Sequence, residues 1–270
     1  MRALLLAAGL GNRLRPLTNY LPKCLVPIHG RPLLDYWLES LVNGGVSEIL
    51  INTHYLAPLV RQYLSQSTWL PYITVVHEEI LLGTGGTILL NRDFFKDEAF
   101  LVAHADNLTI FDVRDFANQH AARPQETELT MMVFEAPDPQ SCGIVTLDRQ
   151  SIVQAFHEKV ANPPGTLANA AVYMLEPSVV DMMATLGKEQ IDLSTGVIPH
   201  LLGKMFTYNN TCYHRDIGTI ASWTKANKDF PIMLSAAQDE QAWGYILESG
   251  DGSLPSIIEQ LLVSTAQQRL

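Results

Sequence analysis

The stretch RALLLAAGLGNRLRPLT, residues 2–18, decides how the N-terminal half of this 270-residue chain folds. It begins with an apolar run, residues 3–8, which is typical of a short buried strand. Gly9 and Gly11 follow, and glycine lets the backbone turn tightly and approach a ligand closely, with peptide N–H groups free to bind an anion. The stretch therefore predicts a strand that leads into a phosphate-binding loop.

Cationic side chains reinforce this interpretation. Arg13 and Arg15 lie in the loop itself, and Lys23 lies in the next segment, PKCLVPIHGRP, residues 22–32. Guanidinium and ammonium groups bind phosphate oxygens and neutralise their charge. We therefore expect a polyphosphate ligand at this end of the chain.

Two common glycine motifs do not fit. A dinucleotide site needs a third glycine directly before a helix, but Leu14 stands there and Pro16 interrupts any helix. A P-loop needs Gly-Lys followed by Ser or Thr, whereas Lys23 lies well beyond the glycines and is followed by Cys24. A dinucleotide-dependent dehydrogenase and a P-loop ATPase are both disfavoured.

The stretch resembles the signature of the sugar-1-phosphate nucleotidyltransferases, GxGxRLxPLT followed by PKxLxP and a further glycine. The matching residues are Gly9, Gly11, Arg13, Leu14, Pro16, Leu17, Thr18, Pro22, Lys23, Leu25, Pro27 and Gly30. Asn12 departs from the Thr or Ser usual in that family, but an amide also hydrogen-bonds phosphate. The resemblance implies that Arg13 and Lys23 hold the phosphates during catalysis. It implies a nucleotide site made of Leu6, Ala8, Gly9, Gly11, Asn12, Arg13, Lys23, Glu78, Gly83 and Thr84.

Composition limits the other possibilities. The chain is 47% hydrophobic and 17% charged, so it can bury a sizeable core. Its net charge of −10 provides no basic surface for nucleic acid or for anionic lipid. The three cysteines are too few and too scattered for a zinc site or a disulfide framework. We find no apolar run long enough for a membrane span or a signal peptide, and we expect a cytoplasmic protein.

The pattern along the chain predicts an α/β fold. Strand-like runs at residues 2–8, 47–53, 72–78 and 99–106 alternate with helix-like segments at residues 32–45, 57–65 and 84–92. This alternation favours a Rossmann-like, mainly parallel mixed sheet with helices on both faces.

From residue 128 the pattern changes to successive strand-like runs, at 128–136, 142–148, 151–159 and 168–177. They predict an antiparallel, sugar-binding extension of the sheet. We expect helices at residues 177–186 and 194–202, a return to the site at residues 211–218, and a helix through Trp223 and Lys228. The predicted domains are thus a nucleotidyltransferase domain, residues 1–230, with a nucleotide-binding half (about 1–127) and a sugar-binding half (about 128–230). A C-terminal tail, residues 231–270, follows with two helices separated at residues 249–253.

Two aspartates occupy similar positions far apart in the sequence. Asp106 follows the apolar run FLVAHA, so it should emerge at the carboxyl end of a strand, where open α/β sheets bind ligands. Asp216 likewise lies between a strand-like run and a glycine. Two carboxylates at a phosphate repel each other unless a cation lies between them, and Mg²⁺ prefers carboxylate and phosphate oxygens. We therefore predict a magnesium site, and the resemblance gives Asp106 and Asp216 as its ligands, with Asp106 also catalytic and in contact with the sugar phosphate.

The segment EEILLGTGGT, residues 78–87, predicts a helix start rich in glycine. Gly83, Gly85 and Gly86 permit close approach of a ligand to the backbone. The segment resembles the family element LGTAG or LGTGG, which lies along the base and the sugar. The acidic residues Glu78 and Glu79 before it are similar to those of the guanylyltransferase members.

A further group of residues suits a sugar phosphate. A carboxylate accepts sugar hydroxyls, an ammonium holds phosphate, and an amide both donates and accepts hydrogen bonds. The resemblance assigns these roles to Glu158, Lys159 and Asn169, with Gly143 near the sugar. Where the family has proline and glycine, this chain has Val160 and Ala170.

The expected reaction is transfer of a nucleotidyl group from an NTP to a sugar 1-phosphate, with magnesium as cofactor. GTP with a mannose-like or heptose 1-phosphate is favoured. One alternative is a cytidylyl- or uridylyltransferase that acts on another phosphorylated acceptor such as phosphocholine. The other is a non-catalytic, nucleotide-sugar-binding regulatory subunit. The expected partners are the two substrates, without nucleic acid or membrane, and the apolar positions of the tail are consistent with a homodimer.

Overall fold

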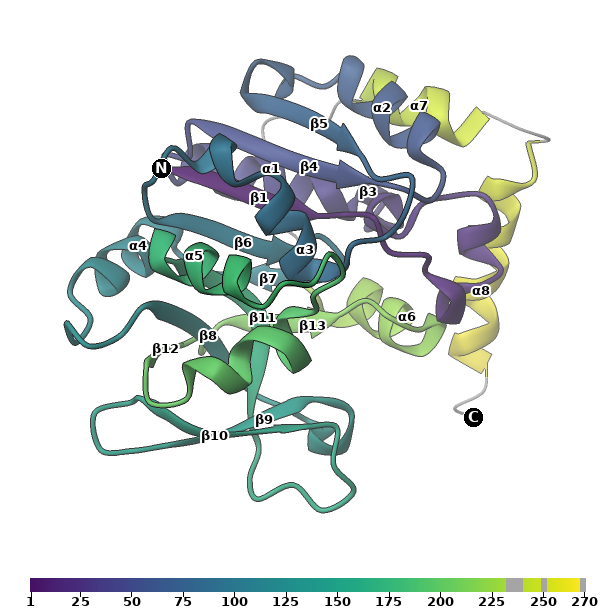
Figure 1. Cartoon of the computed structure of the whole chain (residues 1–270). Helices are drawn as coiled ribbons and strands as arrows, with labels where there is room; N and C mark the ends of the chain where they lie inside the picture. Colours follow the sequence, from purple (N-terminus) through teal and green to yellow (C-terminus); the bar gives the residue numbers. More distant parts are fainter. Residues whose placement is uncertain (232–239, 249–251, 268–270) are drawn as a thin grey trace.

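The computed structural model describes residues 1–231, 240–248 and 252–267. In these residues a nine-stranded sheet crosses the molecule, with helices on both sides (Figure 1). Its strands are β1 (Arg2–Leu6), β4 (Glu48–Thr53), β5 (Ile73–His77), β6 (Phe100–His104), β8 (Leu129–Glu135), β9 (Gly143–Leu147), β10 (Val153–Glu158), β11 (Leu167–Leu175) and β12 (Met205–Asn209). The α-helices are α1 (Leu33–Asn43), α2 (Ala57–Ser65), α3 (Gly83–Leu90), α4 (Val113–Ala121), α5 (Pro177–Thr185), α6 (Ile220–Asp229), α7 (Glu240–Glu248) and α8 (Leu254–Gln267).

The first four predicted strands are confirmed as β1, β4, β5 and β6. They pair in parallel in the order β6-β1-β4-β5, so their carboxyl ends share one edge of the sheet. At that edge Leu6 of β1 is level with Asn52 of β4 and with His104 of β6. Side chains from three separate strands therefore meet where the glycine loop begins.

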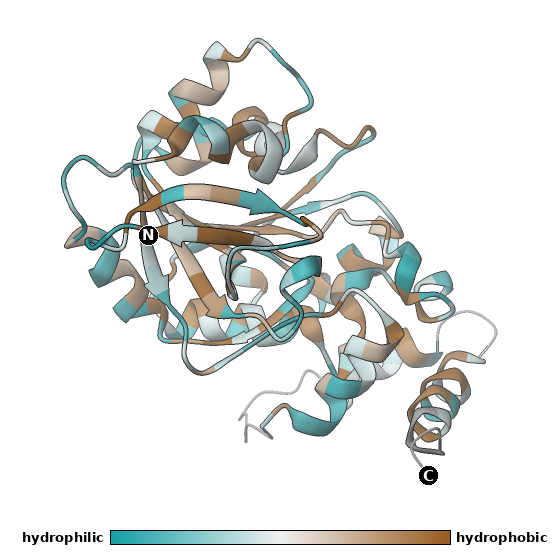
Figure 2. Ribbon diagram, turned by 90° about the horizontal axis from the view of Figure 1, so that it is seen from below, coloured by the Kyte–Doolittle hydropathy of each residue, from teal (hydrophilic) through white to brown (hydrophobic). Residues whose placement is uncertain are grey.

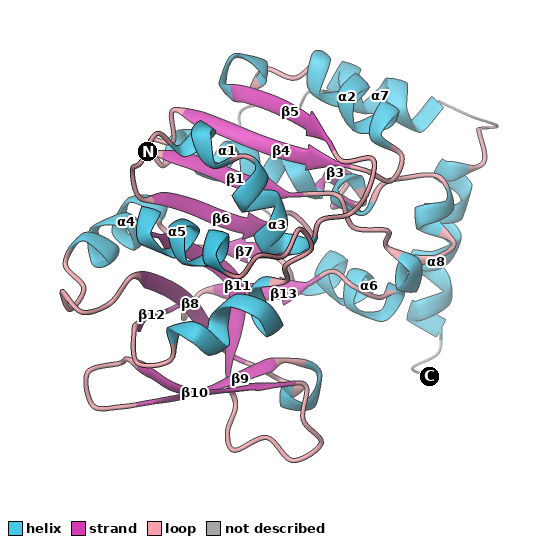
Figure 3. Ribbon diagram, in the orientation of Figure 1, coloured by secondary structure: helices cyan, strands magenta, loops and turns pink. Residues whose placement is uncertain are grey.

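Both faces of the sheet are covered by helices, as predicted (Figure 3). Ala3 and Leu5 pack into the cluster that includes residues of α1, α2, α4 and α7. Leu4, between them, packs with residues of α3 and α5 on the opposite face. Alternate residues of a strand point to opposite faces of the sheet. All three residues are fully buried, because helices cover both faces. The hydrophobic residues of the central strands are visible as brown segments in Figure 2.

The second half continues the same sheet. β11 pairs antiparallel with β6, β8 and β9, and β9 pairs antiparallel with β10, so the predicted antiparallel extension is confirmed. The predicted segment 211–218 contains β13 (Tyr213–Asp216), which pairs with β7 (Asn107–Ile110). A small hairpin, β2 (Pro27–Ile28) with β3 (Arg31–Pro32), follows the N-terminal loop.

One strand of this half was not expected, and one expectation is wrong. β12, for which the sequence pattern gave no indication, pairs in parallel with β8. The segment expected as a helix at residues 194–202 is instead a π-helical turn, η7 (Leu193–Val197), followed by a 3₁₀ turn, η8 (Ile198–Leu201). Pro199, in the first turn of η8, lacks the N–H that a continuous α-helix would need.

The C-terminal tail forms two helices, as predicted, although residues 249–251 of the predicted separation lie outside the described residues. Trp243 and Ile246 of α7 are buried in the cluster that contains residues of α2. Ile257 and Leu262 of α8 pack against the cluster that contains Leu17 of the N-terminal loop. None of the helices in the described ranges is long and apolar enough to cross a membrane.

A buried histidine, His120, lies in the last turn of α4 and faces β8. His120 is 3% exposed, and its ring contacts the Thr130 hydroxyl (2.8 Å) and a Glu176 carboxylate oxygen (3.2 Å) that also accepts a hydrogen bond from Arg123. Burial, together with the Arg123 charge, lowers the pKa of His120 to about 4. The folded protein therefore keeps this histidine neutral at pH values where an unfolded chain protonates it.

We expect acid to destabilise the protein through this residue. Between the ordinary histidine pKa of about 6.5 and the folded value of about 4, the unfolded state binds the additional proton, so stability falls as pH falls. From pH 7.5 to pH 5 the free energy of unfolding should drop by about 2 kcal/mol through His120 alone. Urea denaturation of wild type and His120→Gln at both pH values measures it. Equal pH dependence in the two proteins would contradict the assignment.

Candidate functional site

The loop after β1 turns at Gly11. Its φ of +65° is a backbone conformation that favours glycine, and a Cβ there would lie only 2.8 Å from Thr18 Cγ2. The Thr18 hydroxyl donates a hydrogen bond to the Gly11 carbonyl (2.8 Å) and holds the turn closed. Arg13, in the 3₁₀ turn η1 (Asn12–Leu14), has a side chain that is 71% exposed. The turn is therefore closed at its base by a hydrogen bond, and the loop presents an exposed guanidinium.

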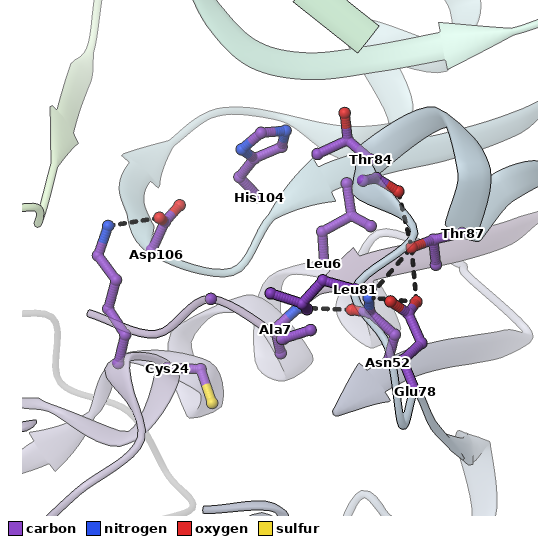
Figure 4. A pocket seen from close by; sticks show the side chains of 14 residues that line it. Leu6, Ala7, Cys24, Asn52, Glu78, Leu81, Thr84, Thr87, His104 and Asp106 are labelled. Atoms are coloured by element: carbon purple, nitrogen blue, oxygen red, sulfur yellow. Dashed lines mark hydrogen bonds and ion pairs between the residues drawn. The ribbon is translucent and has the colours of Figure 1, made fainter. Parts of the chain in front are cut away.

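A cavity of about 190 Å³ lies at the carboxyl edge of the parallel strands (Figure 4). Its walls come from the N-terminal loop, the ends of β4 and β6, and the start of α3. The lining residues are Leu6, Ala7, Ala8, Gly9, Lys23, Cys24, Asn52, Glu78, Leu81, Gly83, Thr84, Thr87, His104 and Asp106. Segments far apart in the sequence thus form a single cavity, in the place where open α/β sheets bind ligands.

One end of the cavity is built on Glu78, which is 5% exposed. Its Oε1 accepts hydrogen bonds from the Asn52 amide (2.9 Å) and the Thr87 hydroxyl (2.6 Å), and its Oε2 accepts one from the Leu82 N–H (3.3 Å). The Asn52 Oδ1 in turn accepts a hydrogen bond from the Ala7 N–H (2.7 Å), which fixes the amide against the loop. In Figure 4 these side chains converge on one wall. These hydrogen bonds fix the orientation of the Asn52 amide and of the Glu78 carboxylate.

The other end of the cavity is ionic. The Lys23 ammonium pairs with Asp106 Oδ2 and lies 3.4 Å from Asp216 Oδ1. Arg13 NH2 lies 4.0 Å from Asp216 Oδ2. Gly218 lies directly beside this group, because a Cβ there would be 2.7 Å from Asp216 Oδ2 and 3.1 Å from Arg13 NH2. Two cations of the N-terminal loop therefore face two carboxylates from distant strands.

These charges shift one another's pKa values. Burial alone would lower the pKa of Lys23, but the Asp106 and Asp216 carboxylates raise it above its ordinary value. Burial alone would raise the pKa of Asp106, but the Lys23 ammonium, with a smaller contribution from His104, holds it below its usual range. At neutral pH the ammonium and this carboxylate are both charged, as two groups that handle phosphate should be.

The residues expected to bind the sugar phosphate lie on the β9, β10 and β11 side. A Cβ on Gly143 would lie 2.7 Å from Glu158 Oε2, so these two residues are in contact. The Lys159 ammonium lies 3.1 Å from Glu158 Oε1, and the Lys159 side chain is 64% exposed. Burial raises the pKa of Cys142, and the negative charges of Asp138, Asp216 and Glu158 add to the rise. Glu158 and Gly143 are paired in register at the end of β10 and the start of β9.

Asn169 lies on β11, beside the strand that leads to Asp106. The next residue, Ala170, accepts a hydrogen bond at its carbonyl from the Asn107 side chain (3.0 Å). The family resemblance placed the glycine of the relatives at Ala170. The residue with left-handed backbone is Ala171, at φ +53°, because the strand bulges there.

The structure thus brings most of the predicted residues into one region, but not into one cavity. Gly11, Asn12 and Arg13 lie beside the cavity in the loop, and Asp216 adjoins it through Lys23. Gly143, Glu158, Lys159 and Asn169 do not line it. Sequence analysis missed several lining residues, namely Ala7, Cys24, Asn52, Leu81, Thr87 and His104. Asn52 could have been found, since it is a polar residue at the carboxyl end of a buried strand.

The family of this chain follows from comparison with known proteins. A family model described as "Nucleotidyl transferase" matches residues 2–231. The chain belongs to this nucleotidyl transferase family. Its match covers the whole of the cavity and both aspartates, and it ends before α7 and α8.

Curated relatives are similar over much of the chain. The mannose-1-phosphate guanylyltransferase of Mycobacterium tuberculosis (strain ATCC 25618 / H37Rv) is 30% identical over 232 residues, which are 84% of this chain and 64% of that protein. The glucose-1-phosphate thymidylyltransferase of Streptomyces griseus is 31% identical over 188 residues, 69% of this chain and 52% of that protein. The matched part of the chain therefore spans less than two thirds of these relatives.

Solved structures share the fold. A putative glucose-1-phosphate thymidylyltransferase from Bacillus anthracis in complex with a sucrose has a TM-score of 0.79 at 20% identity, covering 89% of this chain and 99% of that chain. HddC from Yersinia pseudotuberculosis complexed with GMP-PN has a TM-score of 0.72 at 23% identity, covering 85% of this chain and 99% of that chain. The Rossmann-like α/β fold expected from the sequence is confirmed.

The bulge at Ala171 generates a stability prediction. A non-glycine residue in left-handed backbone is strained by roughly 1–2 kcal/mol. Glycine relieves this strain, but its larger loss of conformational entropy on folding offsets part of the gain. We expect Ala171→Gly to raise the free energy of unfolding by roughly 0.5–1 kcal/mol. Ala170→Gly, at the adjacent buried position, should lower it instead. Urea denaturation measures both, and a destabilised Ala171→Gly would show that the bulge is not strained.

Proposed function

We propose that this chain transfers a nucleotidyl group from an NTP to a sugar 1-phosphate and releases pyrophosphate, with GTP and a mannose-like or heptose 1-phosphate as substrates. The observation that carries the proposal is the ionic end of the cavity. There Lys23 and Arg13 face Asp106 and Asp216. The wall built on Glu78, at the other end of the cavity, suits a nucleobase. Membership of the nucleotidyl transferase family and the curated mannose-1-phosphate guanylyltransferases support it.

The chemistry needs charge neutralisation and positioning. An oxygen of the sugar 1-phosphate attacks the α-phosphorus of the NTP, and the bond from that phosphorus to the pyrophosphate breaks. The second pKa of a phosphate monoester is about 6, so the attacking group is already ionised near neutral pH and needs no general base. Lys23 and Arg13 neutralise charge on the phosphate oxygens, and binding the two substrates next to each other lowers the entropic cost of their encounter.

The residues present fit a magnesium ion. Asp106 and Asp216 already converge on one cation, the Lys23 ammonium, and carboxylate oxygens are the protein ligands that Mg²⁺ prefers. In the described residues no cluster of three His, Cys, Asp or Glu side chains could hold a metal. Phosphate oxygens of the substrate would therefore complete the coordination of an ion held by Asp106 and Asp216. When bound, Mg²⁺ would stabilise negative charge on the phosphates.

The wall built on Glu78 supports GTP as the nucleotide. A carboxylate only accepts hydrogen bonds, and guanine carries two neighbouring donors, N1–H and N2–H, on its pairing edge. Among the described residues Oε2 of Glu78 receives only the long hydrogen bond from Leu82, so it has capacity to accept another. Uracil and thymine offer one such donor, beside carbonyl oxygens that the carboxylate would repel. Glu78 therefore favours guanine.

The sugar phosphate is assigned to the neighbouring surface. Glu158 accepts hydrogen bonds from the sugar hydroxyls, and Lys159 binds the phosphate. The Asn169 amide both donates hydrogen bonds to the sugar phosphate and accepts them from it. The absence of a side chain at Gly143 lets the Glu158 carboxylate lie against the backbone, where a Cβ would be 2.7 Å from Glu158 Oε2. Because Lys159 is exposed and paired only with Glu158 among the described residues, it is available to a phosphate.

Pyrophosphate release tests this function. All four NTPs are assayed with magnesium against mannose 1-phosphate, a heptose 1-phosphate, glucose 1-phosphate and phosphocholine. We expect GTP with mannose or heptose 1-phosphate to give the fastest release. Preference for CTP or UTP with phosphocholine would overturn the proposed substrates, and no release from any pair would indicate a non-catalytic binding subunit.

The same assay includes one variant of the ionic group and a control. Asp106→Asn should lower turnover by a factor of about 10²–10³, while the variant stays folded by circular dichroism. Asp181→Asn removes an exposed carboxylate that pairs with Arg92, away from the cavity, and should keep wild-type turnover. Near-normal turnover in Asp106→Asn would refute the role of Asp106.

A further inference from the structure

A buried tyrosine contacts the side chain expected to bind the sugar. Asn169 Nδ2 donates a hydrogen bond to the Tyr173 hydroxyl (2.7 Å), and Asn169 Oδ1 accepts one from the Ala171 N–H (2.9 Å). Tyr173 is 1% exposed, so its hydroxyl cannot reach a substrate itself. Since the Ala171 N–H can only donate, it fixes which end of the amide is oxygen. One amide hydrogen and one oxygen lone pair remain for a ligand.

This contact exists only because β11 bulges. In a regular strand, residues four apart are about 13 Å apart along the chain, too far for a side-chain hydrogen bond. The pairing of β11 with β8 shifts register between Asn169 and Tyr173, with Ala171 in left-handed backbone, and this brings the two side chains together. The bulge is thus shaped around the hydrogen bond, which is typical of bulges next to functional sites.

Tyr173 is buried in the same cluster as Leu193 of the π-helical turn η7. Leu193 donates its N–H to the Thr84 hydroxyl (2.7 Å). The N–H groups of Gly85 and Gly86 both bond to the Ile191 carbonyl (2.8 and 3.1 Å).

The turn at residues 191–197 is therefore bonded to one wall of the cavity and shares a buried cluster with Tyr173. π-Helical turns are rare in proteins, and those that occur are often found at functional sites. Space around it is tight, because a Cβ on Gly83 would lie 2.5 Å from the Ile191 carbonyl oxygen. A displacement of this turn would therefore shift the start of α3.

We propose that Tyr173 is a positioning residue for nucleotidyl transfer: its hydroxyl accepts a hydrogen bond from the Asn169 amide and so orients that amide toward the sugar 1-phosphate. This inference rests on the proposed function, because it takes Asn169 as a sugar ligand. Loss of the Tyr173 hydroxyl should therefore weaken binding of the sugar 1-phosphate and leave binding of the nucleotide unchanged.

The test is Tyr173→Phe, which keeps the ring and removes only the hydroxyl. With GTP and the sugar 1-phosphate that wild type uses best, we expect KM for the sugar 1-phosphate to rise about five- to tenfold, as for one lost hydrogen bond. KM for GTP should stay within twofold. Tyr63→Phe is the matched control, since it removes an equally buried tyrosine hydroxyl from α2 and should leave both KM values unchanged.

A double-mutant cycle separates positioning from a general loss of stability. Asn169→Ala alone should raise KM for the sugar 1-phosphate, and adding Tyr173→Phe to it should cause no further rise, because Tyr173 acts through Asn169. Independent effects of the two substitutions, or an unchanged KM in Tyr173→Phe, would overturn the proposal while leaving the proposed function intact.

Equilibrium binding gives a readout that does not need turnover. Calorimetric titration with GDP-mannose should show weaker binding to Tyr173→Phe than to wild type and to Tyr63→Phe. If wild type binds GDP-mannose but releases no pyrophosphate from any substrate pair, the proposed function fails and this titration still decides the role of Tyr173. If wild type binds no nucleotide sugar, both proposals fall.

Discussion

The site depends on one interaction, the placement of the Lys23 ammonium between the carboxylates of Asp106 and Asp216. The lysine belongs to the N-terminal loop, whereas the aspartates follow β6 and end β13. A buried ammonium is costly unless it is paired, and two neighbouring carboxylates repel each other without a cation. Each side therefore requires the other, and this mutual requirement draws the loop and both strands to the same edge of the sheet.

The rest of the fold keeps these groups in place from both faces. Leu14 and Leu17 anchor the loop in a cluster with Ile217, the residue after Asp216. On the opposite face, the turn at residues 191–197 holds the start of α3 through Thr84 and the glycines beside it. The start of α3, from the first half of the chain, is consequently bonded to a turn from the second half.

Much of this arrangement can be read from the sequence, because it follows local rules. An apolar run before glycines predicted β1, and a carboxylate after an apolar run placed Asp106 at the end of a strand. Features set by distant contacts were not predictable. The parallel pairing of β12 with β8 depends on the completed sheet, and an alanine at 171 gives no sign of the left-handed backbone that the bulge imposes. Asn52 differs from these, because a polar residue near the carboxyl end of a buried strand could have been assigned to the cavity from the sequence.

Calorimetric titration of Mg²⁺ into the nucleotide-free protein tests the central interaction most directly, with wild type compared to Lys23→Met. In the wild type the ammonium already neutralises the two carboxylates on which a metal would depend. Removing it should therefore tighten Mg²⁺ binding by about tenfold or more, since a competing unit charge a few ångströms away is worth over 1 kcal/mol even near the protein surface. Unchanged or weaker Mg²⁺ binding in Lys23→Met would contradict the account.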